Sequence, residues 1–255
     1  MKIMTMNFRN GNFDDGVNSW VNREPVLLGI LREHQPDIIC AQECVRIQSD
    51  SILAAGLNYQ LLTCERDDDE DSEMMAIFYN RSKFLLLASE VFWLSASPDV
   101  PGSSLAYAGC TRIAVVAKLF DRKTRQSFAV INTHLDHESA AARAFGSEVI
   151  LARLPQNLPL ILCGDFNEAP RNSAWNALTK TVFEDAADSV ATVSGPDYSF
   201  HGYFAPHPPA PPEMIDWIML SKNDFAVESI AVITNNNAGI YPSDHFPVCA
   251  DVVMK

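Results

Sequence analysis

Two polar residues that follow an apolar run have side chains suited to catalysis. Residues 158–163 are typical of a buried strand, and Asp165 and Asn167 follow on the loop where that strand is expected to end. Asp165 can accept a proton or position a water, and Asn167 can present an amide to an oxygen that becomes negative. Because Asp and Asn are also common turn formers, this pair alone leaves a turn and a catalytic site as alternatives.

Several other apolar runs end in polar groups or contain one. These runs are residues 2–7 with Asn7, 37–43 with Glu43, 128–134 with His134, 214–220 with Asp216, and 242–248 with Asp244 and His245. Their alternating or continuous apolar residues indicate strands. A single acid at a strand end is usually only a solvated group, and a histidine there is often satisfied by a backbone carbonyl. Several such groups occurring together would indicate a site, whereas one alone would not.

Asp216 differs from the other acids because Ile215 and Trp217 flank it. This setting predicts a buried carboxylate, and a buried charge needs a partner. His245 is a candidate partner. Contact with the carboxylate would fix the tautomer of the ring and raise its basicity.

The oxygen-rich residues favour a hard cation. Glu43, Asp244 and Asn7 offer the carboxylate and amide oxygens that Mg²⁺ prefers. Zinc is disfavoured, because Cys40 and Cys44 lack a second cysteine pair. The chain also contains no H-E-x-x-H, G-x-x-x-x-G-K-[ST], G-x-S-x-G or G-x-G-x-x-G motif. Zinc-protease, P-loop, serine-hydrolase and dinucleotide-binding functions therefore have no motif to support them.

Taken in chain order, these segments resemble the endonuclease/exonuclease/phosphatase superfamily, to which deoxyribonuclease I belongs. The matching residues are Asn7, Gln42-Glu43, Asn132-Thr133-His134, Gly164-Asp165-Phe166-Asn167, Ile215-Asp216 and Ser243-Asp244-His245. The resemblance implies an α/β fold, a two-sheet sandwich that is mixed, largely antiparallel and flanked by helices. It also implies hydrolysis of a phosphate ester that depends on Mg²⁺ or Mn²⁺.

The resemblance further assigns roles to individual residues. It makes Glu43 the main metal carboxylate, with Asn7 and Asp244 nearby. Asp165 would orient or deprotonate the attacking water, and Asn167 would hold the phosphate. Phosphoryl transfer of this kind relies on positioning and on electrostatic stabilisation of the phosphate oxygens.

The remaining groups of the expected site bind the phosphate. By the same resemblance, His245 would bind the scissile phosphate with support from Asp216, and His134 would contact another phosphate oxygen. A bacterial branch of the superfamily, with poorly defined substrates, is similar in the segments 92–98, 111–112 and 199–203. In that branch Arg112 and His201 look like substrate-facing groups, and Arg112 is expected to be the one cation available for bidentate phosphate contact.

The acidic composition of the chain limits the classes of substrate that it is expected to bind. The chain has a net charge of −13, which opposes a long polyanion track because nucleic-acid binding gains affinity from clustered Lys and Arg. Where apurinic endonucleases carry basic, DNA-inserting loops, residues 65–73 form an acidic run. We therefore expect a small phosphate ester or a nucleic-acid end as substrate and disfavour duplex DNA.

The chain is expected to form one domain over residues 1–255, because the motifs span it and no half could hold the site alone. Helices are expected from about residue 23 to 34 and from 138 to 154, and strands near 59–63 and 74–79 on either side of the acidic run. The proline-rich segment 205–212 is expected to be extended and to border the site.

The six cysteines lie mostly in apolar contexts, and no signal peptide or long apolar segment is visible. These features predict reduced cysteines in a cytoplasmic protein without a membrane partner, and they leave the oligomeric state open.

The sequence thus predicts a Mg²⁺-dependent hydrolase of phosphodiesters or phosphomonoesters. Within this class, the alternative is a nuclease that acts on DNA or RNA. From another class, the alternative is a catalytically inactive binding module with the same fold. The sequence argues against that last alternative, because each expected catalytic position holds the expected chemistry.

Overall fold

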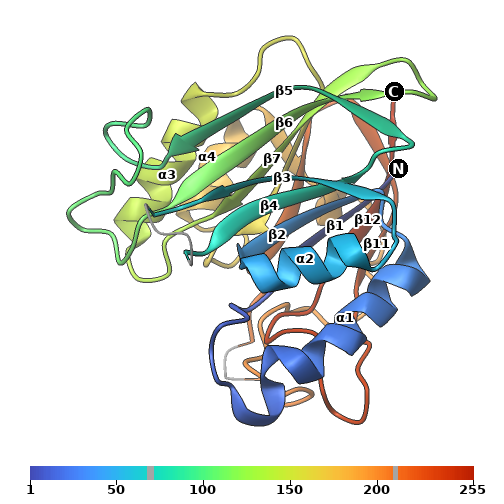
Figure 1. The fold of residues 1–255 in the computed structure, drawn as a ribbon. Helices are drawn as coiled ribbons and strands as arrows, with labels where there is room; N and C mark the ends of the chain where they lie inside the picture. Colours follow the sequence, from blue (N-terminus) through green and yellow to red (C-terminus); the bar gives the residue numbers. More distant parts are fainter. Residues whose placement is uncertain (68–71, 209–211) are drawn as a thin grey trace.

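Two six-stranded sheets pack face to face in the computed structural model of the protein, which describes residues 1–67, 72–208 and 212–255 (Figure 1). Both sheets are mixed. The predicted two-sheet α/β sandwich is therefore confirmed.

The first sheet places a parallel pair of strands, β1 and β2, at its centre. In spatial order its strands are β11 (Phe225–Val232), β12 (Val248–Met254), β1 (Lys2–Asn7), β2 (Ile38–Cys44), β4 (Met74–Asn80) and β3 (Tyr59–Glu65). The other neighbours are antiparallel. Because β1 and β2 run the same way, their carboxyl ends meet at one edge, where Asn7 lies opposite Gln42.

The second sheet repeats this arrangement around the parallel pair β7 and β8. Its strands are β5 (Phe84–Trp93), β6 (Ile113–Asp121), β7 (Ser127–His134), β8 (Leu160–Asp165), β10 (Asp216–Ser221) and β9 (Phe183–Asp185). The carboxyl ends of β7 and β8 bring His134 opposite Asp165. Each sheet thus delivers polar groups from the ends of its central strands.

Helices cover the outer face of each sheet (Figure 1). The first sheet packs against α1 (Trp20–His34) and α2 (Arg46–Ala54), and the second against α3 (Ala140–Ala152) and α4 (Ser173–Lys180). Two short 3₁₀ turns lie at Gly16–Asn18 and Ala186–Ser189. Helix α1 begins three residues before the predicted start and ends at His34, as predicted; Gln35 follows with a left-handed φ of 46° and precedes Pro36.

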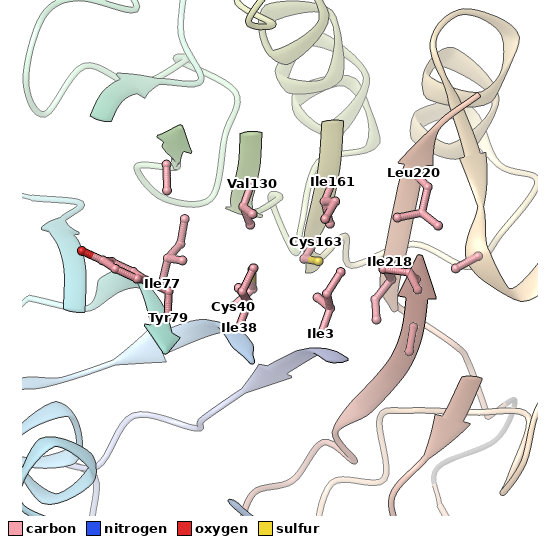
Figure 2. Packing of buried hydrophobic residues seen from close by; sticks show 14 of the residues in the cluster. Ile3, Ile38, Cys40, Ile77, Tyr79, Val130, Ile161, Cys163, Ile218 and Leu220 are labelled. Atoms are coloured by element: carbon pink, nitrogen blue, oxygen red, sulfur yellow. The ribbon is translucent and has the colours of Figure 1, made fainter. Parts of the chain in front are cut away.

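The main core lies between the sheets. Figure 2 shows inward-facing side chains of both sheets, among them Ile3, Ile38 and Cys40 from the first and Ile161 and Cys163 from the second. The helices bury the outer faces as well, so the central strands are apolar on both sides and read as nearly continuous apolar runs. This explains why these strands were recognisable in the sequence.

The remaining element predictions need small corrections. Asp165 is the last residue of β8 and not part of a following loop, and Asp216 begins β10 instead of lying inside a strand. Strands β3 and β4 flank the acidic run as expected, although residues 68–71 of that run lie outside the described residues.

The proline-rich segment was predicted to be extended, but its described part turns, because the amide of His207 donates to the carbonyl of Phe204 (2.7 Å). Residues 209–211 lie outside the described residues, so the prediction that the whole segment borders the site stays a prediction. In the described ranges, no helix combines the length and the apolar character that crossing a membrane requires.

Candidate active site

One edge of the sandwich gathers most of the predicted site residues. Asn7, Glu43, His134 and Asp165 come from the carboxyl-terminal ends of β1, β2, β7 and β8, and Asp216 and His245 from the start of β10 and the loop before β12. Both sheets thus contribute to the same group of side chains.

Gly164 allows β8 to approach β7 closely at this edge. A Cβ atom at position 164 would lie 2.2 Å from the carbonyl oxygen of Thr133, a contact that no larger residue can accept. The glycine therefore keeps Asp165 in register beside His134.

Asn7 connects the two sheets within the site. Its Nδ2 donates to Oε1 of Glu43 (2.9 Å) and to Oδ2 of Asp165 (3.0 Å). The Asn7 side chain is buried, and its own Oδ1 accepts from the amide of Arg9 (2.8 Å), which fixes the orientation of the carboxamide. A single residue thus holds one carboxylate of each sheet in place.

The predicted contact between Asp216 and His245 is confirmed. His245 Nδ1 lies 2.8 Å from Oδ2 of Asp216, and His245 Nε2 lies 3.8 Å from Oδ2 of Asp165. Burial lowers the pKa of His245, but the negative charge of Asp216, its hydrogen bond and the charges of Asp165 and Asp244 outweigh burial and raise the pKa to about 10. The ring is therefore a cation near neutral pH, held between two buried carboxylates.

Asp165 is the carboxyl group most able to exchange a proton. Burial, reinforced by the charge of Asp216, raises its pKa well above the usual range, while His245 and the hydrogen bond from Asn7 counteract part of this shift. A raised carboxyl pKa brings proton exchange closer to neutral pH, as a general base requires.

His134 and Asn167 form a second pair beside Asp165. Asn167 has a left-handed φ of 49°, its amide donates to Oδ1 of Asp165 (2.9 Å), and its Nδ2 lies 2.9 Å from His134 Nε2. Burial, and then the charge of Arg112, lower the pKa of His134 well below its usual range. His134 is consequently a neutral ring that positions Asn167, and its contact with a phosphate oxygen stays a prediction.

The acidic groups suit a divalent cation. The pKa of Asp244 is raised by burial and by the nearby charge of Glu43, so these two carboxylates repel each other. A bound cation would relieve that repulsion. Asp165, Asp216 and His245 also have one ligand atom each within 4.8 Å of one another and could hold a metal ion.

The expectation that Arg112 is the one cation available for bidentate phosphate contact stays a prediction, although Arg112 lies at the site. Arg112 lines a narrow cavity together with Glu43, His134 and a second arginine, Arg66. A third, Arg9, is close enough to Asp244 and Glu43 for their charges to raise its pKa. Arg66 was not recognisable because it precedes an acidic run and carries no motif of its own.

Among these arginines, Arg112 has no carboxylate partner within the described ranges. Arg66 and Arg9 are each paired with acids, whereas the contact recorded for Arg112 is between its Nη2 and Nδ1 of His137 (3.3 Å).

His201 is near the site but does not reach its surface. The ring is fully buried, packs on Phe246 at 4.2 Å between centroids, and accepts a hydrogen bond from the amide of Tyr203 (3.2 Å). Burial, with a smaller contribution from His245, lowers its pKa to about 3. The prediction that His201 faces the substrate is therefore not supported, because the ring has no exposed surface. What the structure shows instead is a neutral ring that packs on Phe246, the residue after His245.

Sequence reasoning also missed Arg23, which organises the loops around the site. Its buried guanidinium donates to the carbonyl oxygens of Asn18 (2.6 Å), Phe8 (2.8 Å), Pro242 (2.9 Å) and Arg9 (3.0 Å). The cation thereby ties α1 to the loops that follow β1 and precede His245. An arginine in an amphipathic helix is normally read as a surface residue, so no sequence signal revealed it.

Cys110, Asp136 and His137 form another group with metal-ligating atoms. The two carboxylate oxygens of Asp136 already accept hydrogen bonds from four backbone amides, at 109, 110, 138 and 139. The guanidinium of Arg112 also contacts His137 (3.3 Å). A cation at this group would face that positive charge, so we assign no metal to it.

The fold and the site together define a two-sheet α/β sandwich with an edge site of carboxylate, amide and imidazole groups. The profile of the Endonuclease/Exonuclease/phosphatase family matches residues 4–245, and the chain belongs to this family. Members of the family are hydrolases that act on phosphate esters.

Solved structures of similar proteins match the fold of this chain over nearly its whole length. A functionally unknown conserved protein from Enterococcus faecalis V583 is 34% identical, with a TM-score of 0.91 and all of both chains covered. A mannosyl-6-phosphatase from Bacteroides thetaiotaomicron is 30% identical, with a TM-score of 0.90 and 99% of each chain covered.

A more distant curated relative is a nuclease. The Ccr4 3′-5′-exoribonuclease subunit of the CCR4-Not complex of Emericella nidulans is 25% identical over 223 residues. The match covers 64% of this chain and 33% of that protein, so the chain spans about a third of the relative's length.

Proposed function

We propose that the protein is a divalent-metal-dependent phosphoesterase that hydrolyses a small phosphate ester by attack of water. The observation that carries this proposal is the connected group formed by Glu43, Asn7, Asp165, His245 and Asp216. It joins a partly exposed carboxylate to a buried imidazolium through hydrogen bonds and close ionic contacts. Such a group combines a cation site, a base and a cationic donor within one edge of the fold.

Glu43 and Asp244 would hold Mg²⁺ or Mn²⁺, with Asn7 beside them. When bound, the cation would polarise a phosphoryl oxygen and favour deprotonation of water. We place it here and not between Asp165 and Asp216, because the cationic ring of His245 already compensates those two carboxylates. Glu43 is also the more exposed carboxylate, which leaves room for the waters that Mg²⁺ retains.

The protein's own groups would then act on the water and the phosphate. Asp165, with its raised pKa, would orient the water and accept its proton. His245 would donate to a phosphoryl oxygen and stabilise its growing charge, and Asp216 would keep the ring oriented and charged. Asn167 would hold the phosphate, and Arg112 would contact another of its oxygens.

We also propose that the chain forms one functional domain and works in the cytoplasm. Because the site draws on residues from Asn7 to His245 and on both sheets, we treat residues 1–255 as one functional domain. The six cysteines are free, which suits the reducing conditions of the cytoplasm, where we place the protein.

A small phosphomonoester is the favoured substrate class. The full-length similarity to a protein described as a mannosyl-6-phosphatase supports it, as does the acidic charge of the chain. A nuclease acting on RNA or DNA is the second candidate, supported by the similarity to a 3′-5′-exoribonuclease subunit. An inactive binding module remains the alternative from another class, and the experiment below separates it from both.

The test is hydrolysis of p-nitrophenyl phosphate and bis-p-nitrophenyl phosphate with Mg²⁺ or Mn²⁺, before and after addition of EDTA. We expect metal-dependent turnover that falls at least about 10²-fold in Glu43→Gln, because this change removes the main metal carboxylate. Glu148→Gln, the same change on the exposed face of α3, should behave as wild type. Turnover that survives both EDTA and Glu43→Gln would refute the metal assignment, and no turnover of any phosphate ester would favour the binding module.

A further inference from the structure

We propose that Glu73 protects the metal carboxylate Glu43 by keeping the neighbouring cation of Arg66 away from it. This inference rests on the proposed function, because it concerns how the same site stays available for a divalent cation. It assigns a role to the last residue of the acidic run, which the sequence analysis used only as evidence against duplex DNA.

The first observation is the position of the arginine. Arg66, Glu73 and Glu43 line one cavity of about 10 Å³, which is too small for a phosphate group, so the residues around it lie close together. The charge of Arg66 also contributes to the lowered pKa of His134. Arg66 thus lies at the site itself, on a side chain long and flexible enough to reorient.

The second observation is what holds this arginine. Arg66 and Glu73 face each other where β3 and β4 lead into the acidic run, and the Arg66 amide donates to the Glu73 carbonyl (3.0 Å). Arg66 Nη1 lies 2.8 Å from Glu73 Oε2, and Arg66 Nε lies 3.1 Å from Asp67 Oδ2. The Glu73 side chain is 13% exposed and that of Asp67 44%, so Glu73 is the less screened partner.

Asn10 links this ion pair to Glu43. Its Nδ2 donates to Oε1 of Glu73 (3.2 Å), and its backbone amide donates to Oε2 of Glu43 (3.2 Å). Glu73 therefore has two partners, a cation that must be neutralised and an amide that helps to position Glu43. The two functions can be separated, because glutamine at position 73 keeps an acceptor oxygen for Asn10 but loses the charge that holds Arg66.

The consequence follows from charge balance. Without the Glu73 carboxylate, the exposed Asp67 is the one carboxylate partner that the described residues would leave to Arg66, and Glu43 is the other carboxylate that lines the same cavity. An arginine bound to Glu43 would compete with the divalent cation and repel it. Glu73 is thus a positioning residue that acts through Arg66.

The experiment measures Mn²⁺ binding by isothermal titration calorimetry, which does not depend on turnover. We expect Glu73→Gln to raise the Kd for Mn²⁺ about tenfold, and the double variant Glu73→Gln with Arg66→Met to return it to within about threefold of wild type. Asp67→Asn, which removes the exposed partner of the same arginine, is the matched control and should change the Kd by less than about threefold. A crystal structure of metal-free Glu73→Gln should place Arg66 within about 4 Å of a Glu43 oxygen.

Three other results would contradict either the proposed metal site or the role of Glu73. If wild-type protein binds no Mn²⁺, the proposed metal site fails and this inference with it. If wild type binds Mn²⁺ and Glu73→Gln binds it equally well, only the inference fails. The inference also fails if Arg66→Met does not restore binding in Glu73→Gln, because Glu73 would then act on the cation without Arg66.

Discussion

Four carboxylates and two imidazoles lie together at this site, and their environments give them different charges. His245 is held cationic between Asp216 and Asp165, whereas His134 is kept neutral by burial and by neighbouring arginines. Two histidines of one site thus have opposite electrostatic roles. The sequence identified both rings as site residues but could not distinguish their charges, because those depend on tertiary neighbours.

The charge of His245 leads to a prediction about pH. If the cationic ring stabilises the phosphate, activity is present below the pKa of about 10 and is lost as the pH rises through it. Asp216→Asn removes the strongest influence that raises this pKa, so the alkaline limb of the kcat profile should move to lower pH by about one to three units. The rate should also fall by about 10²-fold, because the ring loses its orienting partner.

The control for this prediction is Asp185→Asn. Asp185 is a buried carboxylate of the same sheet whose contacts are with Trp175 Nε1 (3.1 Å) and the amide of Ala187 (3.0 Å), not with His245. Its substitution should leave the alkaline limb in place. An alkaline limb that stays unchanged in Asp216→Asn would show that another group titrates there.

At the level of elements, the apolar pattern of the sequence predicted the central strands, because strand formation there depends on local sequence. The strands β1, β2, β7 and β8 were found because both of their faces are buried and they end in polar motif residues. The connections between Asn10, Glu73 and Arg66 were not predicted, because loop residues distant in sequence carry no period. They meet only when the carboxyl end of β2 is folded against the β3–β4 hairpin.

Arg23 connects helix α1 to the loops of the site, and its loss should lower the free energy of unfolding. Arg23→Met removes four hydrogen bonds to buried or partly buried carbonyl oxygens that join α1 to the loops of the site. We expect a loss of about 3 kcal/mol or more in the free energy of unfolding, because these carbonyl groups lose their donors inside the protein. Urea unfolding followed by circular dichroism measures it.

The same substitution at Arg32 provides the control on the same helix. Arg32 is exposed, so Arg32→Met should change the free energy of unfolding by no more than about 0.5 kcal/mol. Equal unfolding midpoints for the two variants would mean that the buried guanidinium does not hold α1 and the loops together.

At the level of the whole molecule, two similar sheets build one site at their shared edge. Gln42 of the first sheet donates to Oδ1 of Asn132 in the second (2.7 Å), and Asn132 donates back to the carbonyl oxygens of Ala41 and Ala76 (2.9 Å each). All of these groups are buried. The two motif residues are therefore buried and connect the sheets beneath the site, a position that the sequence alone did not reveal.

The charge of the whole molecule bears on the choice between a small ester and a polymer. The net charge is −13, and two of the arginines at the site are already paired, Arg9 with Asp15 and Arg66 with Glu73. Duplex DNA requires many unpaired cations along its path, because each neutralised phosphate adds affinity through counterion release. A small ester needs only the metal, His245 and a contact such as Arg112.

We therefore expect negligible nicking of supercoiled plasmid at about physiological salt under conditions in which p-nitrophenyl phosphate or a sugar phosphate is hydrolysed with Mg²⁺. Agarose electrophoresis measures nicking, with deoxyribonuclease I as the positive control for the plasmid. Glu43→Gln purified in parallel separates intrinsic activity from a contaminating nuclease, since only intrinsic nicking should disappear in that variant. Efficient nicking by wild type that Glu43→Gln abolishes would overturn the preference for small substrates, because an acidic protein would then have to bind duplex DNA through the few cations at its site.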